Sequence, residues 1–299
     1  MRIALVGQPN CGKSTIFNQV AGYKSITSNF PGKTITYTST SININGTTFE
    51  LIDLPGTYSL SSSDLAELET RNYLLSGKAD VVINVVDSSI LIRSLELTLQ
   101  LLELGIPIIM CLNMIDEALR KGMIIDDKKL SNILGIIVCK SVASKGYGIK
   151  NLFQIALKSG AQKLRKPEVV PFSKDVEVVI EKLINRIDEY LKDEIILSKR
   201  LMAVKLLERD SYFIEKVQKK SPEMIEEVES LRKILEKSHG KTSDQVISSE
   251  RHSLAMNIFE DVVEVKHGKR TTLRDKFDNW LLHRYLGYLF LFIIPPLRI

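Results

Sequence analysis

Residues 2–15 read Arg-Ile-Ala-Leu-Val-Gly-Gln-Pro-Asn-Cys-Gly-Lys-Ser-Thr, and they decide the fold of the first half of the chain. The run up to Val6 is apolar and strand-like, whereas the residues from Lys13 onward have the spacing of a helix. Gly-x-x-x-x-Gly-Lys-Ser between a strand and a helix is typical of a phosphate-binding loop, because its backbone N–H groups and the helix N-terminus attract phosphate. A chance glycine-rich turn would not need that strand and helix around it. The loop residues expected to contact a nucleotide are Gly7, Asn10, Cys11, Gly12, Lys13, Ser14 and Thr15.

Short apolar runs alternate with helical patterns from residue 1 to about residue 165. Strands are expected at Arg2–Val6, Thr38–Ile44, Phe49–Asp53, Val81–Asp87, Ile106–Asn113 and Ile136–Cys139. Helices are expected at Lys13–Ala21, Leu65–Leu75, Leu91–Leu104, Asp127–Leu134 and Ile149–Gln162. This alternation predicts an α/β domain with a mostly parallel sheet covered on both faces. The turn around Gly46 predicts one antiparallel pair at the sheet edge.

A second motif, Asp53-Leu-Pro-Gly56, closes the apolar strand that begins at Phe49. The Asp53 carboxylate can hold a Mg²⁺-bound water, and the Gly56 N–H can approach a γ-phosphate because glycine has no Cβ in the way. Alone the motif is weak, since Asp before Pro-Gly is usually a turn. Following a phosphate-binding loop, it makes Ser14 and Asp53 candidate Mg²⁺ ligands, and Lys13 and Gly56 candidate catalytic residues.

Recognition of guanine is predicted from Asn113-Met114-Ile-Asp116, which follows another apolar strand. Guanine presents two adjacent donors that one carboxylate can accept, whereas adenine would leave Asp116 buried and unpaired. Asn113 would tie this loop to the phosphate loop and to the base. Met114 stands where the common pattern has Lys, and its apolar stem can lie along the base.

The least specific element is Ser141-Val142-Ala143, after the strand ending at Cys139. There the Ala143 N–H can donate to the guanine O6, with Ser141 supporting the loop and Val142 completing it. In this order, each at the C-terminal end of a strand, the four motifs predict an enzyme that binds and hydrolyses GTP. An adenylate-binding enzyme is the poorer alternative, because it gives Asp116 no role.

Catalysis is predicted less directly than binding. Many GTPases have Gln directly after Asp-x-x-Gly to orient the attacking water, and here Thr57 stands in that place. Either hydrolysis is slow or another element supplies charge and orientation. Asn10 could help bind a monovalent cation against the β- and γ-phosphates, acting as a built-in counterpart of an arginine finger. The alternative is that Asn10 only stabilises the turn.

The chain changes character near residue 170 and then becomes rich in helix formers. Helical spacing predicts helices at Val176–Leu191, Ile195–Glu208, Tyr212–Lys219, Pro222–Lys237, with Pro at the first helical position, and Ser243–Val265. We therefore expect an all-α domain at residues 172–266 after an α/β domain at 1–165. Its many charged residues are expected to lie on solvated helix faces.

Composition adds few constraints. The formal charge of +5 on 299 residues gives weak support to an anionic partner and does not require nucleic acid. Three scattered cysteines fit neither a disulfide framework nor a zinc site, and no signal peptide opens the sequence. The apolar run at residues 285–297 is shorter than a membrane helix, so it could be a buried helix or the start of a spanning segment.

The motifs resemble those of the N-terminal part of FeoB-type ferrous iron transporters. The residues that carry the resemblance are Asn29-Phe-Pro-Gly-Lys-Thr34, Asp53-Leu-Pro-Gly-Thr-Tyr-Ser-Leu60, Asn113–Asp116 and Ser144-Lys-Gly-Tyr-Gly-Ile149. The resemblance implies a Ras-like P-loop GTPase domain, a helical domain that stabilises bound GDP, and at 270–299 an approach to the first membrane helix. It also implies that Thr34 binds Mg²⁺ in the GTP state and that K⁺ acts through Asn10. Lys33 and Val142 depart from the family pattern.

The resemblance therefore implies a module at the cytoplasmic face of the membrane that regulates ferrous iron uptake. Its implied partners are the permease domain of the same protein, a small accessory protein of the uptake system and a second copy of itself, without nucleic acid. A soluble GTPase that binds RNA during ribosome assembly is the alternative, although no basic module follows the first domain. A module that holds GTP without hydrolysing it is the third hypothesis.

Overall fold

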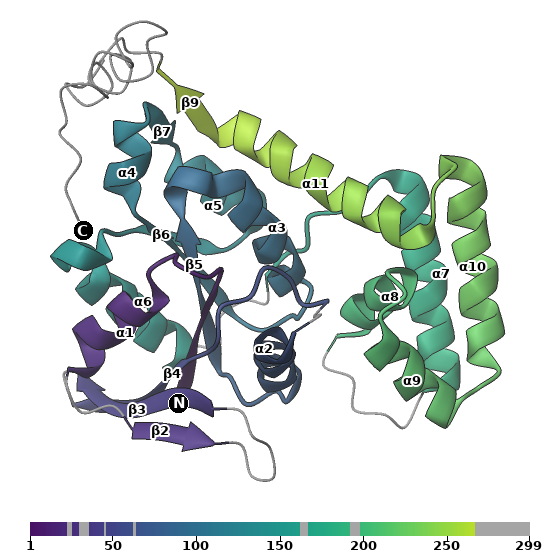
Figure 1. The fold of residues 1–299 in the computed structure, drawn as a ribbon, viewed down its shortest axis with the longest axis horizontal. Helices are drawn as coiled ribbons and strands as arrows, with labels where there is room; N and C mark the ends of the chain where they lie inside the picture. The colour runs from purple at the N-terminus through teal and green to yellow at the C-terminus, as the bar shows by residue number, and fades with distance from the viewer. Residues whose placement is uncertain are drawn as a thin grey trace, which may run out of the picture. The chain divides into compact units, whose positions relative to one another are not determined.

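The computed structural model describes residues 1–22, 26–29, 36–44, 46–61, 64–161, 167–191 and 198–266. Its centre is a seven-stranded sheet with the strand order β2-β3-β4-β1-β5-β6-β8 (Figure 1). The strands are β1 (Arg2–Gly7), β2 (Ile26–Asn29), β3 (Thr36–Ile44), β4 (Thr47–Asp53), β5 (Val81–Asp87), β6 (Ile108–Asn113) and β8 (Ile137–Lys140). Strands β4, β1, β5, β6 and β8 pair in parallel with one another, whereas β2 pairs with β3, and β3 with β4, in antiparallel orientation. The mostly parallel sheet and the antiparallel pair around Gly46 are thus confirmed, but this pair is not at the sheet edge, because β2 pairs with the outer side of β3.

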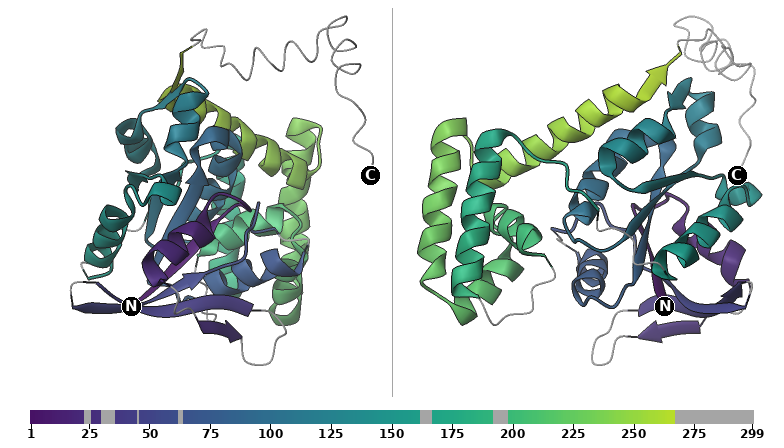
Figure 2. Two further views of the ribbon diagram at one scale, coloured as in Figure 1. Left: turned by 60° about the vertical axis from the view of Figure 1, so that its left-hand side comes forward. Right: turned by 180° about the vertical axis from the view of Figure 1, so that it is seen from behind.

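Helices cover both faces of the sheet (Figure 2). Alternate strand residues point to opposite faces, so Ile3 and Leu5 pack with Phe17 and Phe153, whereas Val6 belongs to the core on the other face. The first face is covered by α1 (Lys13–Ala21) and α6 (Ile149–Ala161). The second is covered by α2 (Leu65–Leu75), α3 (Leu91–Leu102), α4 (Ile115–Arg120) and α5 (Asp127–Leu134), with short 3₁₀ turns η1 (Ser88–Ile90) and η2 (Ala143–Lys145) at two strand ends.

The second part of the chain is helical, as predicted. Its helices are α7 (Lys174–Tyr190), α8 (Lys199–Leu207), α9 (Ser211–Lys220), α10 (Met224–His239) and α11 (Ser243–Val262). Helix α11 extends from these helices and packs against α3 and α5 (Figure 1). One apolar core runs from the sheet through α3 into the helices, which explains why residues 1–264 form one compact unit.

Some details of the helix and strand predictions were wrong. Val263–Val265 does not prolong α11 but forms strand β9, which pairs with β7 (Met123–Ile125). Helix α10 begins at Met224, so Pro222 lies before the helix and not at its first position. Strand β2 and helix α4 were not expected, because four and six residues are too few to show a period. None of the helices in the described part of the chain has the length and hydropathy of a membrane span, and residues 270–299 lie outside the described residues.

Candidate nucleotide-binding site

The phosphate loop has the backbone that its sequence requires. Asn10 and Gly12 have positive φ angles of 64° and 95°, and α1 begins at Lys13. A Cβ on Gly12 would lie 2.2 Å from Asn113 Nδ2, and a Cβ on Gly7 would lie 2.2 Å from the carbonyl oxygen of Val85. Glycine is therefore needed at both positions, because the end of another strand approaches too closely for a Cβ. Cys11 is buried, and burial raises the pKa of its thiol to about 11.

Three polar side chains meet beside the start of α1. Ser14 Oγ donates to Asp53 Oδ2 at 3.0 Å, and the charge of Lys13 acts on that carboxylate. Burial raises the pKa of Asp53, although Lys13 and the Ser14 hydroxyl oppose this effect. Asp53 Oδ1 is buried and has no partner among the described residues. A hydroxyl and a carboxylate with a spare oxygen are ligands that suit Mg²⁺, so these residues fit the ion.

The segment after Asp53 is packed against the phosphate loop. A Cβ on Gly56 would lie 2.9 Å from the backbone nitrogen of Pro9, so glycine is needed here even without a nucleotide. Thr57 is fully buried, and its hydroxyl donates to the Ser59 carbonyl at 2.6 Å and contacts Glu67 Oε1 at 3.2 Å. The side chain that replaces the usual glutamine is thus engaged inside the protein and is not placed to orient water.

Asn113 joins the phosphate loop to both base-recognition loops. Its Nδ2 donates to the Cys11 carbonyl at 2.9 Å, while its Oδ1 accepts from Ser141 Oγ at 3.1 Å. The same Oδ1 also accepts from the Ala143 N–H at 2.9 Å. The link to the phosphate loop was predicted, whereas the bond from Ala143 was not. Donation from the Ala143 N–H to the guanine O6 stays a prediction, and it requires this N–H to be shared. Val142 is buried beside it.

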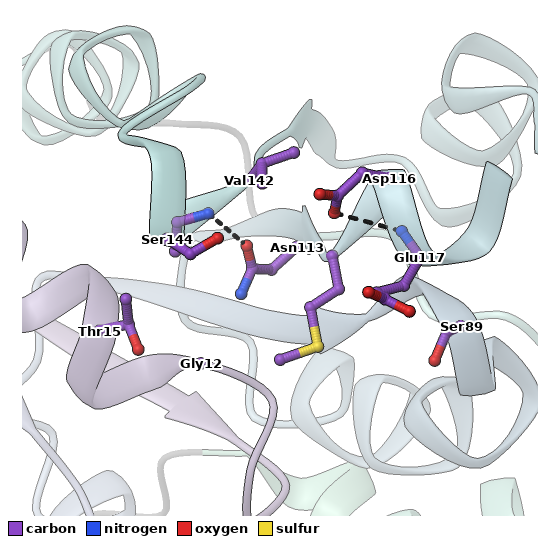
Figure 3. Close-up of a pocket in the computed structure, with 10 residues that line it drawn as sticks. Gly12, Thr15, Ser89, Asn113, Asp116, Glu117, Val142 and Ser144 are labelled. Carbon is purple, nitrogen blue, oxygen red and sulfur yellow. Dashed lines mark hydrogen bonds between the residues drawn. The ribbon is translucent and has the colours of Figure 1, made fainter. Parts of the chain in front are cut away.

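A cavity of about 410 Å³ lies between these loops (Figure 3). Of the predicted site residues it is lined by Gly12, Thr15, Asn113, Met114, Asp116, Val142 and Ala143. Its other lining residues, Ser89, Glu117 and Ser144, were not among the predicted nucleotide contacts. Met114 has a positive φ of 57°, which turns the chain between β6 and α4. Asp116 Oδ2 accepts from Lys145 Nζ at 2.8 Å, and this bond lowers the pKa of Asp116.

Two predicted features fall on residues that the structure does not describe. Thr34, the candidate Mg²⁺ ligand from the first switch segment, lies outside the described residues, as does Lys33. The structure therefore brings together the residues expected from the phosphate loop, the Asp53–Gly56 motif and the two base-recognition loops. It leaves the switch threonine as a prediction.

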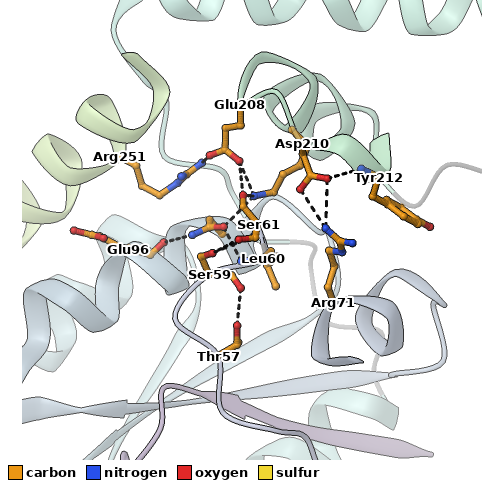
Figure 4. Close-up of polar contacts among 12 residues, drawn as sticks. Thr57, Ser59, Leu60, Ser61, Arg71, Glu96, Glu208, Asp210, Tyr212 and Arg251 are labelled. Atoms are coloured by element: carbon orange, nitrogen blue, oxygen red, sulfur yellow. Dashed lines mark hydrogen bonds and ion pairs between the residues drawn. The ribbon is translucent and has the colours of Figure 1, made fainter. Parts of the chain in front are cut away.

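A buried polar network connects the segment after Gly56 to the helical region (Figure 4). Lys205 Nζ on α8 donates to Ser61 Oγ at 2.5 Å, to Gln100 Oε1 at 3.1 Å and to Glu208 Oε2 at 2.7 Å. Gln100 Oε1 in turn accepts from the Leu60 N–H at 2.9 Å. Burial would raise the pKa of Glu208, but Lys205 and Arg251 hold it at about 2. The expectation that charged residues of the helical region are solvated is wrong for these side chains, which are buried at the contact.

A second contact lies on α2, which follows the same segment. Arg71 Nη1 is 3.2 Å from Asp210 Oδ2, and both side chains are almost fully buried. The Arg71 guanidinium also lies 4.7 Å from the centroid of the Tyr212 ring. Two buried contacts therefore hold Ser61 and Arg71 against the helices. The sequence gives little sign of these contacts because the partners are more than 100 residues apart.

Comparison with known protein families places both parts of the chain. Residues 1–156 match the family model "Ferrous iron transport protein B", and residues 172–264 match "FeoB cytosolic helical domain". The chain is 35% identical over 305 residues to the Fe(2+) transport protein A/Fe(2+) transporter FeoB fusion protein of Porphyromonas gingivalis, covering 98% of this chain and 36% of that protein. It is 39% identical over 222 residues to the Fe(2+) transporter FeoB of Escherichia coli K12, covering 71% of this chain and 27% of that one.

Solved structures agree. A GDP-bound single-residue variant of the S. thermophilus FeoB G-domain superposes with a TM-score of 0.82 at 31% identity, covering 88% of this chain and all of that one. The cytosolic domain of the T. maritima FeoB iron transporter in its GMPPNP form gives a TM-score of 0.73 at 30% identity, covering 88% of this chain and 99% of that one. The chain spans about a third of the length of the curated relatives that it matches. With both parts matched in order, the chain belongs to the ferrous iron transport protein B family and carries its G-domain and its helical domain.

Proposed function

We propose that the chain binds GTP and GDP in the cavity beside Asn113 and hydrolyses GTP to GDP and phosphate. One observation carries this proposal: Asn113 bonds the phosphate loop with one end of its amide and the base-recognition loop with the other. The cavity has Gly12 and Thr15 at one side and Asp116 at the other, as a nucleotide requires. Family membership and the nucleotides named for the related structures support it.

In the proposed site each residue has a chemical role. Lys13 and the N–H groups of the phosphate loop bind the β- and γ-phosphates, and Asp116 accepts the two guanine donors. Lys145 must leave the Asp116 carboxylate, at least in part, when the base enters. Mg²⁺ would be held by Ser14 and, through water, by Asp53, with Thr34 joining in the GTP state; the ion supplies charge neutralisation at the phosphates.

Slow and K⁺-stimulated hydrolysis is part of the proposal. Its support is that Thr57 is buried with its hydroxyl engaged, so the glutamine function is missing. Asn10 stands at the exposed turn of the phosphate loop with a positive φ, and its side-chain oxygen is a hard ligand of the kind that alkali cations take. Positive charge at that point would stabilise the transition state as an arginine finger does.

We further propose that the chain regulates ferrous iron uptake from the cytoplasmic face of the membrane. On this reading residues 1–165 are the catalytic domain, 172–266 the regulatory helical domain, and 270–299 the approach to a membrane helix. The permease domain of the same protein is the proposed partner, because the curated relatives are about three times as long and are named iron transporters. A small accessory protein, as in the P. gingivalis fusion, and self-association are further proposals.

The decisive experiment measures GTP turnover in K⁺ and in Na⁺ buffer for the wild type, Asn10→Ala and Asp116→Asn. We expect faster turnover in K⁺ for the wild type, and no difference between the two ions for Asn10→Ala. Equal wild-type rates in both buffers would remove the role given to Asn10, whereas absence of turnover would favour the module that only holds GTP. The RNA-binding alternative is not favoured by the family, and salt-sensitive binding of structured RNA would revive it.

A further inference from the structure

A cation–π contact joins the segment after Gly56 to helix α3. The guanidinium carbon of Arg93 lies 4.4 Å from the centroid of the Tyr58 ring. Tyr58 is 44% exposed, so protein packing alone does not fix its ring. Its backbone N–H donates to Glu67 Oε1 at 2.8 Å. Glu67 therefore restrains the backbone of Tyr58, and Arg93 restrains its side chain.

Arg93 is also tied to the phosphate loop through its backbone. Gln8 Nε2 donates to the Arg93 carbonyl oxygen at 2.7 Å, and Gln8 is buried. Gln8 directly precedes Pro9, the residue against which Gly56 packs. One residue of α3 thus contacts the phosphate loop with its carbonyl group and the Gly56–Tyr58 segment with its guanidinium group.

The charge of Arg93 is not neutralised by Glu96, which lies one turn further along α3 and pairs with another residue. Glu96 stands three residues on, where opposite charges pair on a helix surface. Its Oε1 instead lies 2.7 Å from His252 Nδ1 of α11. In the described part of the chain, the Arg93 guanidinium has neither a hydrogen bond nor an ion pair. Because Glu96 pairs with His252 of the helical region, it does not pair with Arg93, and the Arg93 guanidinium contacts the Tyr58 ring instead.

We propose that Arg93 is a positioning residue for GTP hydrolysis. Its guanidinium holds Tyr58, and thereby the backbone of the Gly56–Tyr58 segment, in the geometry that a γ-phosphate requires. This role rests on the proposed function. Thr57 is buried, so its side chain cannot orient the attacking water. The segment can then contribute to hydrolysis only through the position of its backbone N–H groups, and Arg93 helps to fix that position. His252 supports that role from the helical region by retaining Glu96.

The first test compares steady-state GTP hydrolysis and GDP affinity in Arg93→Ala, Arg93→Lys and Tyr58→Phe. An exposed cation–π contact of this kind corresponds to about a two- to fivefold effect, so Arg93→Ala should lower kcat by that factor. KM for GTP and the affinity for GDP should stay unchanged, since the base and phosphate contacts are intact. Arg93→Lys keeps the cation and Tyr58→Phe keeps the ring, so both should retain most of the rate. Arg186→Ala, which removes an exposed arginine of α7, is the matched control.

The second test uses the competition for Glu96. His252→Ala should also lower kcat, because the released Glu96 can pair with Arg93, and the double variant His252→Ala/Glu96→Gln should recover it. Fluorotyrosine at position 58 gives a readout without turnover: its fluorine resonance should shift in Arg93→Ala and in His252→Ala. A wild-type kcat in Arg93→Ala, an unrecovered double variant or an unmoved resonance would each overturn the proposal. A wild-type chain without any turnover would instead refute the proposed function.

Discussion

Replacing Lys205 by methionine should loosen both the fold and the segment that follows Gly56. The Lys205 side chain is 1% exposed and that of Glu208 is 8% exposed, so the pair lies in a nearly dry environment. Methionine keeps the apolar stem but removes the ammonium group from Ser61, Gln100 and Glu208. Removing one partner of a buried ion pair costs about 3–5 kcal/mol, and Arg251 remains beside Glu208, so we expect a loss of about 3 kcal/mol.

Urea unfolding at pH 7 measures this loss, with Lys237→Met on the exposed face of α10 as the control. Amide hydrogen exchange adds a local readout, because the Leu60 N–H is bonded to the Gln100 oxygen that Lys205 holds. Leu60 should exchange faster in Lys205→Met than in the control. A loss below about 1 kcal/mol with unchanged Leu60 exchange would refute the reasoning, because the buried pair would then contribute no more than a surface pair.

Three further predictions concern single groups. Gly56→Ala should reduce GTP turnover at least about tenfold and have little effect on GDP affinity. The reason is that the new Cβ would lie 2.9 Å from the Pro9 backbone and displace this segment from the γ-phosphate. Turnover assays together with GDP titration measure both effects. Asp116→Asn should lower the preference for GTP over xanthosine triphosphate on the order of a hundredfold or more, which competition binding measures, and an unchanged preference would refute the base-recognition argument. Burial raises the pKa of Glu103 from 4.5 to about 7, so the wild type should lose stability as pH rises from 4.5 through 7, by at most about 1.4 kcal/mol per unit. Glu103→Gln should remove that slope in denaturant unfolding from pH 5 to pH 8, and a parallel slope in both proteins would contradict it.

The parts of the site that the sequence predicted are those made from contiguous residues at strand ends. Gly12-Lys13-Ser14 has a local requirement, a positive φ followed by a helix start, and that requirement is visible in any single sequence. Asp53 and Asn113 each end an apolar strand, and the carboxyl ends of parallel strands meet at one sheet edge. Their convergence therefore follows from the order of strands and helices, without knowledge of any side-chain contact.

The contacts that the sequence did not predict join residues that are far apart and have no shared period. Lys205 stands among apolar residues of α8, and a lysine on a helix is expected in solvent, yet its side chain is buried. What decides its environment is the packing of α8 against Ser61 and Gln100, more than 100 residues earlier in the chain. The same applies to the short strands β7 and β9, whose three residues each gain their structure from pairing and not from propensity.

The two sets of residues also differ in what they can transmit. The predicted set, which we propose binds phosphate and base, lies at the ends of paired strands. The unpredicted set includes Lys205, Arg71 and Arg93, whose side chains contact the segment from Gly56 onward and the helices beside it. A change in that segment on loss of the γ-phosphate would therefore act first on buried ion pairs, whose energy depends steeply on geometry. We therefore expect the helical region to respond to the state of the nucleotide through this segment, and substitutions in it to leave guanine affinity, which we assign to Asn113 and Asp116, unchanged.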